Sequence, residues 1–104
     1  MMEKINILYI GTHPEILETV VRLINKNENW NAIGSESNII AIQLFMKINF
    51  SIVLLGCGIP QDDEDRLREI FSIHNPKCKI VQHYGGGSGL LNNEIFTALE
   101  KDYA

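Results

Sequence analysis

Residues 50–60 read FSIVLLGCGIP, an almost unbroken apolar run that stops abruptly at two glycines and a proline. A short apolar run that is closed by turn residues is typical of a strand buried on both faces of a sheet. Residues 4–11, KINILYIG, repeat this pattern near the start of the chain. The two runs therefore predict strands of a parallel sheet.

A helical pattern follows the first of these strands. Thr12 and Glu15 have the spacing of a capping box, and Pro14 lies in the expected first turn, where its missing N–H costs nothing. Apolar residues then recur at helical spacing, which predicts a helix that buries one stripe. The residues expected in this stripe are Ile16, Leu17, Val20, Val21, Leu23 and Ile24.

Strands and helices are expected to alternate along the whole chain. The predicted strands cover residues 4–10, 30–35, 50–55 and 79–82, the last extended to 84 in one interpretation. The later helices are predicted at 38–48, with Ser37 as its cap, at 62–74 and at 90–101. This alternation implies right-handed crossovers and an α/β fold, with a parallel sheet between two layers of helices.

Length and composition are those of an ordinary globular protein. The chain has 104 residues, of which 45% are hydrophobic and 21% charged, so we expect a single domain over residues 1–104. It has no apolar run of ~20 residues and no signal peptide, which predicts a cytoplasmic protein without a membrane partner. A net charge of −4 without a basic cluster argues against direct nucleic-acid binding. Cys57 and Cys78 lack CxxC spacing and are expected to be reduced.

Three segments resemble the CheY-like receiver domains of bacterial response regulators. ILYIGTHPEI (residues 7–16) is similar to the family's ILIVDDDPEI pattern, and GSESNIIAIQLF (34–45) places Ala41 where the family has an alanine. Pro60 lies four residues after Gly56, as the family's proline follows its phosphoacceptor aspartate. The resemblance covers residues 1–84 and implies a flavodoxin-like sheet of four, at most five, strands in the order 2-1-3-4.

The resemblance also implies that the residues needed for phosphorylation are missing. Gly56 stands at the phosphoacceptor position, and Gly11 and Thr12 replace the acid pair that would hold Mg²⁺, a cation that prefers carboxylate oxygens. His83 or Tyr84, depending on a register of one residue, takes the place of the family's switch hydroxyl. The family's lysine, which follows a fifth strand, has no counterpart.

The acidic cluster after Pro60 is not expected to replace the missing aspartate. Asp62, Asp63 and Asp65 fall at the start of a predicted helix, where the helix dipole favours negative charge. This placement explains the cluster without a phosphorylation site.

In an open parallel sheet, ligands bind at the carboxyl ends of the strands. His13 and Cys57 are expected there, followed by a run whose members are Gly85, Gly86, Gly87, Ser88 and Gly89. The N–H groups of such a turn could hold an anion, although the run lacks the P-loop lysine and a flexible connection is the preferred interpretation. Cys57 with a histidine could form a metal or nucleophilic site, but no motif supports it, so no metal, cofactor or catalytic residue is predicted.

The leading functional hypothesis is a non-phosphorylatable receiver-like module that acts as a stand-alone adaptor in bacterial two-component-like signalling. It would bind a protein partner or itself, as a homodimer, through a surplus of apolar residues on the second helix that includes Ile39, Ile40 and Met46. The alternative is a sensor that binds an anion or nucleotide at the strand ends and the GGGSG turn. Enzymatic activity ranks last.

Overall fold

The computed structural model describes residues 4–56, 58–83 and 88–100. Its parallel sheet consists of β1 (Ile5–Ile10), β2 (Trp30–Ser35), β3 (Ile52–Leu55) and β4 (Lys79–Gln82). The helices are α1 (Pro14–Asn25), α2 (Asn38–Lys47), α3 (Gln61–His74) and α4 (Ser88–Glu100). The strand order is β2-β1-β3-β4, which confirms the predicted order.

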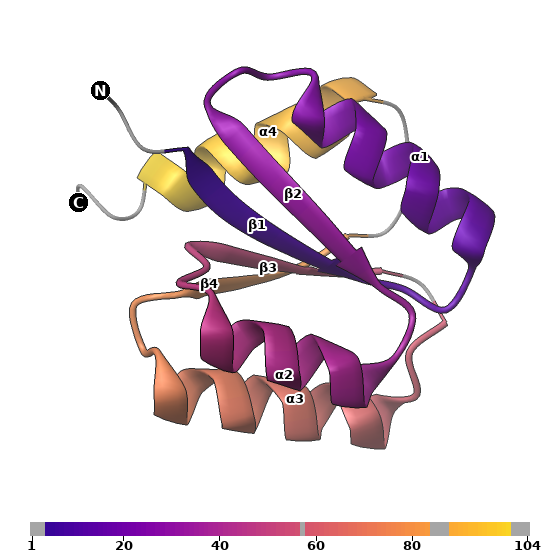
Figure 1. Cartoon of the computed structure of the whole chain (residues 1–104), viewed down its shortest axis with the longest axis vertical. Helices are drawn as coiled ribbons and strands as arrows, with labels where there is room; N and C mark the ends of the chain where they lie inside the picture. The colour runs from indigo at the N-terminus through magenta and orange to yellow at the C-terminus, as the bar shows by residue number, and fades with distance from the viewer. Residues whose placement is uncertain (1–3, 57, 84–87, 101–104) are drawn as a thin grey trace.

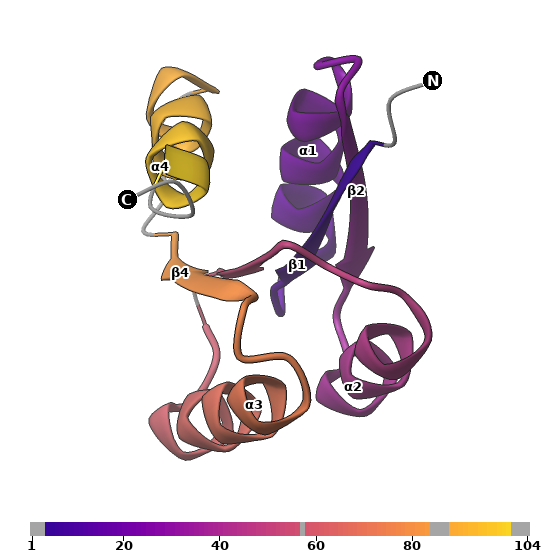
Figure 2. The same ribbon diagram turned by 90° about the vertical axis from the view of Figure 1, so that its left-hand side faces the viewer.

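The sheet lies between two layers of helices, with α1 and α4 on one face and α2 and α3 on the other (Figures 1 and 2). Alternate side chains of each strand enter the two layers: Ile7 and Tyr9 face α1 and α4, whereas Leu8 and Ile10 face α2 and α3. All four are at most 2% exposed. Burial on both faces is the reason that the central strands read as continuous apolar runs.

The start of α1 differs from the prediction. The N-cap is His13 rather than Thr12, and the His13 side chain makes no capping hydrogen bond. Pro14 fixes this boundary, because the residue before a proline is pushed towards an extended conformation, and His13 has φ −102° and ψ 111°. Ile16 is 50% exposed, so its predicted place in the buried stripe is wrong.

Two other boundaries also differ. β3 begins at Ile52 rather than at residue 50, because Phe50 packs against Phe45 and its carbonyl accepts a hydrogen bond from the Asn75 side chain. α4 begins at Ser88, two residues before the predicted start, so Ser88 and Gly89 belong to the helix. A serine suits a helix start, and first-turn N–H groups need no partner within the helix.

β4 ends at Gln82 and is not extended by His83, while Tyr84 lies outside the described residues. In the part of the chain that the structure describes, no helix has the length and apolar character needed to cross a membrane.

Candidate functional site

The carboxyl ends of β1, β3 and β4 bring three of the predicted positions to one edge of the sheet. The Gly11 N–H donates to the Ser35 carbonyl oxygen (3.1 Å), and the Gly56 N–H donates to that of Ile10 (2.8 Å). The His83 N–H donates to the Leu55 carbonyl oxygen, also at 2.8 Å. The sheet ladder thus sets Gly11, Gly56 and His83 side by side.

The aromatic ring of Tyr9 fills the space beside Gly56. A Cβ atom on Gly56 would overlap the Tyr9 hydroxyl oxygen and would lie 2.8 Å from the Tyr9 Cζ and 3.1 Å from the Ile10 carbonyl oxygen. A Cβ on Gly11 would lie 2.9 Å from the Tyr9 Cε1. Because real Cβ atoms essentially never approach so closely, both positions accept only glycine while Tyr9 keeps its place.

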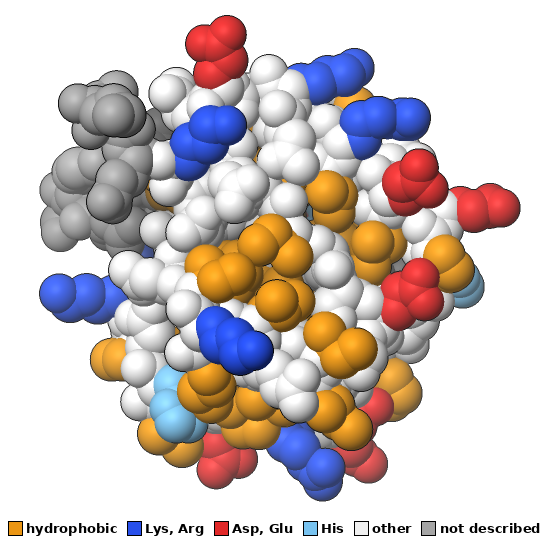
Figure 3. Space-filling view, viewed as in Figure 1, with side chains coloured by type: hydrophobic (Ala, Val, Ile, Leu, Met, Phe, Trp, Pro, Cys, Tyr) orange, Lys and Arg blue, Asp and Glu red, His pale blue; other side chains and the backbone are white. Residues whose placement is uncertain are grey.

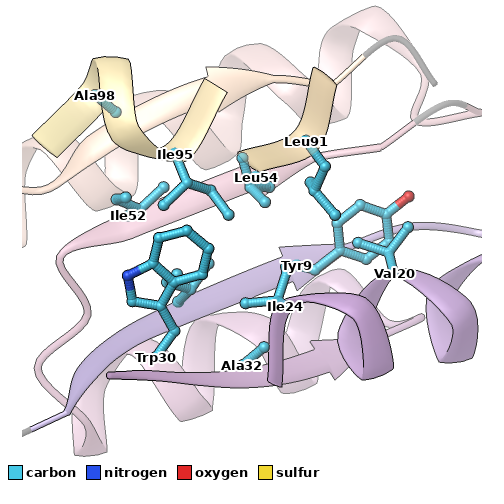
Figure 4. Close-up of a cluster of buried hydrophobic side chains, with 11 residues drawn as sticks. Tyr9, Val20, Ile24, Trp30, Ala32, Ile52, Leu54, Leu91, Ile95 and Ala98 are labelled. Atoms are coloured by element: carbon cyan, nitrogen blue, oxygen red, sulfur yellow. The ribbon is translucent and has the colours of Figure 1, made fainter. Parts of the chain in front are cut away.

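Tyr9 is held there by the α1 and α4 layer. Its side chain is 2% exposed, and Figure 4 shows the ring lying between Val20 of α1 and Leu91 of α4, with its hydroxyl at the periphery of the cluster. Sequence analysis did not single out Tyr9. The sequence did contain a sign of this contact, since strand alternation puts Tyr9 and Gly11 on the same face of the sheet.

His83 is a buried histidine with a specific partner. It is 3% exposed, and its Nδ1 lies 2.7 Å from a carboxylate oxygen of Glu94 on α4. An ionised carboxylate only accepts hydrogen bonds, so Nδ1 carries the proton and donates it. The His83 ring also meets Tyr9 edge to face, with centroids 6.4 Å apart and an interplanar angle of 73°. The sequence missed Glu94, although it lies beside Ile95 on the buried stripe of α4.

Thr12 and His13 lie at the exposed rim of this edge, next to the turn after β3. Gly58 has a φ of +88°, and a Cβ on it would overlap the Thr12 Oγ1 and lie 3.5 Å from the His13 Nε2. Glycine is therefore required here both by the backbone conformation and by the close approach of the two turns.

Several predicted ligand residues cannot be placed. Cys57, Tyr84 and residues 85–87 lie outside the described residues, so their proposed roles stay predictions. Among the residues that are described, no three of His, Cys, Asp or Glu lie close enough together to hold a metal ion. Asp62, Asp63 and Asp65 lie in the first turns of α3, as predicted, where Asp65 accepts a hydrogen bond from Gln61 at 2.9 Å.

No protein-family model and no curated protein matches the sequence. Among solved structures, the receiver domain of an HD domain-containing protein from Pseudomonas fluorescens Pf-5 is similar over 99% of this chain and 92% of that chain, with a TM-score of 0.82 and 15% identity. The chain has the CheY-like, flavodoxin-type fold.

Two further CheY-like structures support this assignment. The non-phosphorylated receiver domain of the stress response regulator RcsB from Escherichia coli has a TM-score of 0.66 at 17% identity, covering 92% of this chain and 76% of that one. Chemotaxis protein CheY4 from Vibrio cholerae has a TM-score of 0.68 at 10% identity, covering 91% and 80%. At these identities the likeness shows the CheY-like fold alone.

Proposed function

We propose that this protein is a pseudo-receiver: a CheY-like signalling module that is not phosphorylated at the usual position and acts as an adaptor by binding a protein. The observation that carries this proposal is the Tyr9 ring beside Gly56, which leaves no room for an aspartate at the end of β3. The CheY-like fold supports a role in signalling only by analogy, because one fold serves many functions.

The residues at this edge do not suit a magnesium ion either. Mg²⁺ is bound in proteins through one or two carboxylates, and Gly11, Thr12 and Gly56 supply none. At the positions that the resemblance assigns, this chain therefore lacks both the residue that accepts the phosphoryl group and the residues that bind the metal ion. An adaptor that works through binding alone needs neither.

We expect no response to the reagents that activate a phosphorylatable receiver. Thermal unfolding with Mg²⁺ and beryllofluoride should give the same midpoint as with Mg²⁺ alone, because a ligand raises the midpoint only if it binds the native state. Mass spectrometry after incubation with acetyl phosphate and Mg²⁺ should show no added phosphoryl group. A midpoint raised only by Mg²⁺ with beryllofluoride would contradict the proposal, whereas a rise with phosphate or a nucleotide alone would favour the anion sensor.

The exposed apolar residues of α2 support a protein-binding role. Ser37 caps this helix by accepting a hydrogen bond from the Ile40 N–H at 3.3 Å, as predicted, and Ala41 and Phe45 fill its buried side. Ile39 and Ile40 are 70% and 52% exposed, and the exposed fraction of Met46 is 47%. Figure 3 shows hydrophobic side chains gathered on the face formed by β2 and α2. Together Ile39, Ile40 and Met46 form the α2 patch.

A variant that carries Ile39→Glu and Met46→Glu should lose its partner and keep its fold. Both residues are exposed, so we expect a change in the free energy of unfolding within ~1 kcal/mol. Binding to a protein captured by the immobilised chain, or self-association measured by light scattering, should weaken at least tenfold, because charge in an apolar interface is disfavoured.

The control for the α2 patch is Ile73→Glu on α3, which adds one glutamate, half the charge change of the double variant, at a residue that is 71% exposed. This control should bind like the unmodified chain. If the α2 variant and the control bound equally well, the α2 patch would not be the interface.

A further inference from the structure

β4 is an open edge of the sheet. Among the described strands it pairs only with β3, and the N–H groups of Lys79 and His83 point to β3, where they donate to the carbonyl oxygens of Ser51 and Leu55. Because successive peptide groups of a strand point to opposite sides, the main-chain N–H and C=O groups of Ile80 and Gln82 point away from β3. An edge of this kind is a template for a further strand.

A groove runs along this edge, and α3 and α4 form its two walls. Its volume is about 660 Å³, and Figure 2 shows α3 and α4 on the two sides of β4. The lining residues from α3 are Arg68 and Ser72, those from β4 and the turn before it are Cys78, Lys79, Ile80 and Val81, and those from α4 are Asn93, Glu94, Thr97 and Ala98. The groove therefore combines an apolar floor with free strand-pairing groups.

The walls decide what kind of partner fits. The edge strand of another α/β domain carries its own helices on both faces, and these would meet α3 and α4. A single extended segment has no such helices and can lie between the walls. The four residues of β4 span roughly 13 Å at ~3.3 Å per residue, so about four residues of a segment can pair with it.

The charges of the groove point to the chemistry of the segment. Among the described residues of the lining, Arg68 and Lys79 are basic and Glu94 is acidic; Arg68 pairs through its Nε with Glu64 at 3.0 Å, and Glu94 accepts a hydrogen bond from His83. The Arg68 guanidinium has further N–H donors besides its Nε–H, so it can bind a second carboxylate next to that of Glu64. A carboxylate on the side of the segment that faces α3 would lie next to Arg68, while small apolar side chains would suit Val81 and Ala98 on the α4 side.

We propose that the β4 edge binds an extended, partly acidic segment of a partner protein, which adds to the sheet as a fifth strand. This is β-augmentation, in which main-chain hydrogen bonds supply affinity and alternate side chains supply specificity. The site is separate from the α2 patch and does not depend on it.

The test uses a capped synthetic peptide of six residues in which valine and glutamate alternate, titrated into the isotopically labelled chain and followed by NMR. We expect the amide signals of Ile80 and Gln82 to shift and their hydrogen exchange to slow, while the Val81 amide, which already faces β3, keeps its exchange rate. N-methylation of the peptide on the edge that pairs with β4 should weaken binding at least tenfold, since each lost hydrogen bond costs ~1 kcal/mol. N-methylation on the opposite edge is the matched control.

Charge reversal tests the role of Arg68, whose side chain is 38% exposed. Arg68→Glu should weaken binding of the glutamate peptide roughly fivefold and strengthen binding of the same peptide with lysine in place of glutamate. The variant with Ile39→Glu and Met46→Glu should bind the peptide normally.

Three results would overturn the inference. The first is no amide shift at millimolar peptide, and the second is a set of shifts that maps to α2. The third is a dimer in the absence of peptide that protects the Ile80 and Gln82 amides, which would assign the edge to a second copy of the chain.

Discussion

Gly56→Asp should lower the free energy of unfolding by about 3 kcal/mol, from an overpacked side chain together with a carboxylate placed against the Tyr9 ring. The position is buried, and its Cβ would overlap the Tyr9 hydroxyl and crowd the Ile10 carbonyl oxygen. Restoring the aspartate of a phosphorylatable receiver therefore damages this fold. Urea denaturation followed by circular dichroism gives the measurement.

A double-mutant cycle shows whether Tyr9 is the cause. Gly56→Ala should cost about 2 kcal/mol in the unmodified chain but well under 1 kcal/mol in a Tyr9→Ala background, because the ring that the new methyl group meets is gone. Gly34→Ala is the matched control: its Cβ would lie 2.7 Å from Leu17 and 2.9 Å from Val21, and the three atoms nearest to it all belong to these two residues. Gly34→Ala should lower the free energy of unfolding by the same amount in both backgrounds. If Gly56→Ala also cost the same with and without the Tyr9 ring, Tyr9 would not be the cause.

The contrast between Gly56 and Tyr9 shows what the sequence could reveal. Apolar runs closed by glycine were enough to predict the strands, and helical spacing was enough to place the helices within a few residues. The resemblance located Gly56 at the end of the third strand, where the structure also places it. The contact between Tyr9 and Gly56 could not be predicted from the sequence, because it depends on the register of β1 against β3, in which Ile10 pairs with Leu55.

The prediction of the histidine at the end of β4 was limited in a similar way. The sequence placed either His83 or Tyr84 there, and the structure shows His83 buried and bonded to Glu94. It could not identify the partner, since Glu94 lies eleven residues further along the chain and is brought back by α4. A carboxylate in an otherwise apolar stripe is a usable sign of such a partner, because a buried charge needs one.

Glu94→Ala should lower the free energy of unfolding by about 2 to 3 kcal/mol, because it leaves the buried His83 without its hydrogen-bond acceptor. The side chains of His83 and Glu94 are 4% and 16% exposed, so water cannot readily replace the lost partner. Glu94→Gln keeps an acceptor oxygen at this position and should cost only about 1 kcal/mol. Chemical denaturation of the three proteins at one pH gives the comparison.

The matched control is Glu64→Ala, which removes the ion pair between Glu64 and Arg68. Glu64 lies 3.0 Å from Arg68 within α3, but the Arg68 side chain is 38% exposed, so the loss should stay below about 1 kcal/mol. Equal losses for Glu94→Ala and Glu64→Ala would mean that burial adds nothing to the His83 bond. A larger loss for Glu94→Ala, with faster hydrogen exchange confined to α4, would instead identify this bond as the one that fastens the last helix to the end of β4. The groove of the proposed fifth strand has α4 as one wall, so the same substitution should then also weaken binding of the glutamate peptide, even though it removes a negative charge from the lining.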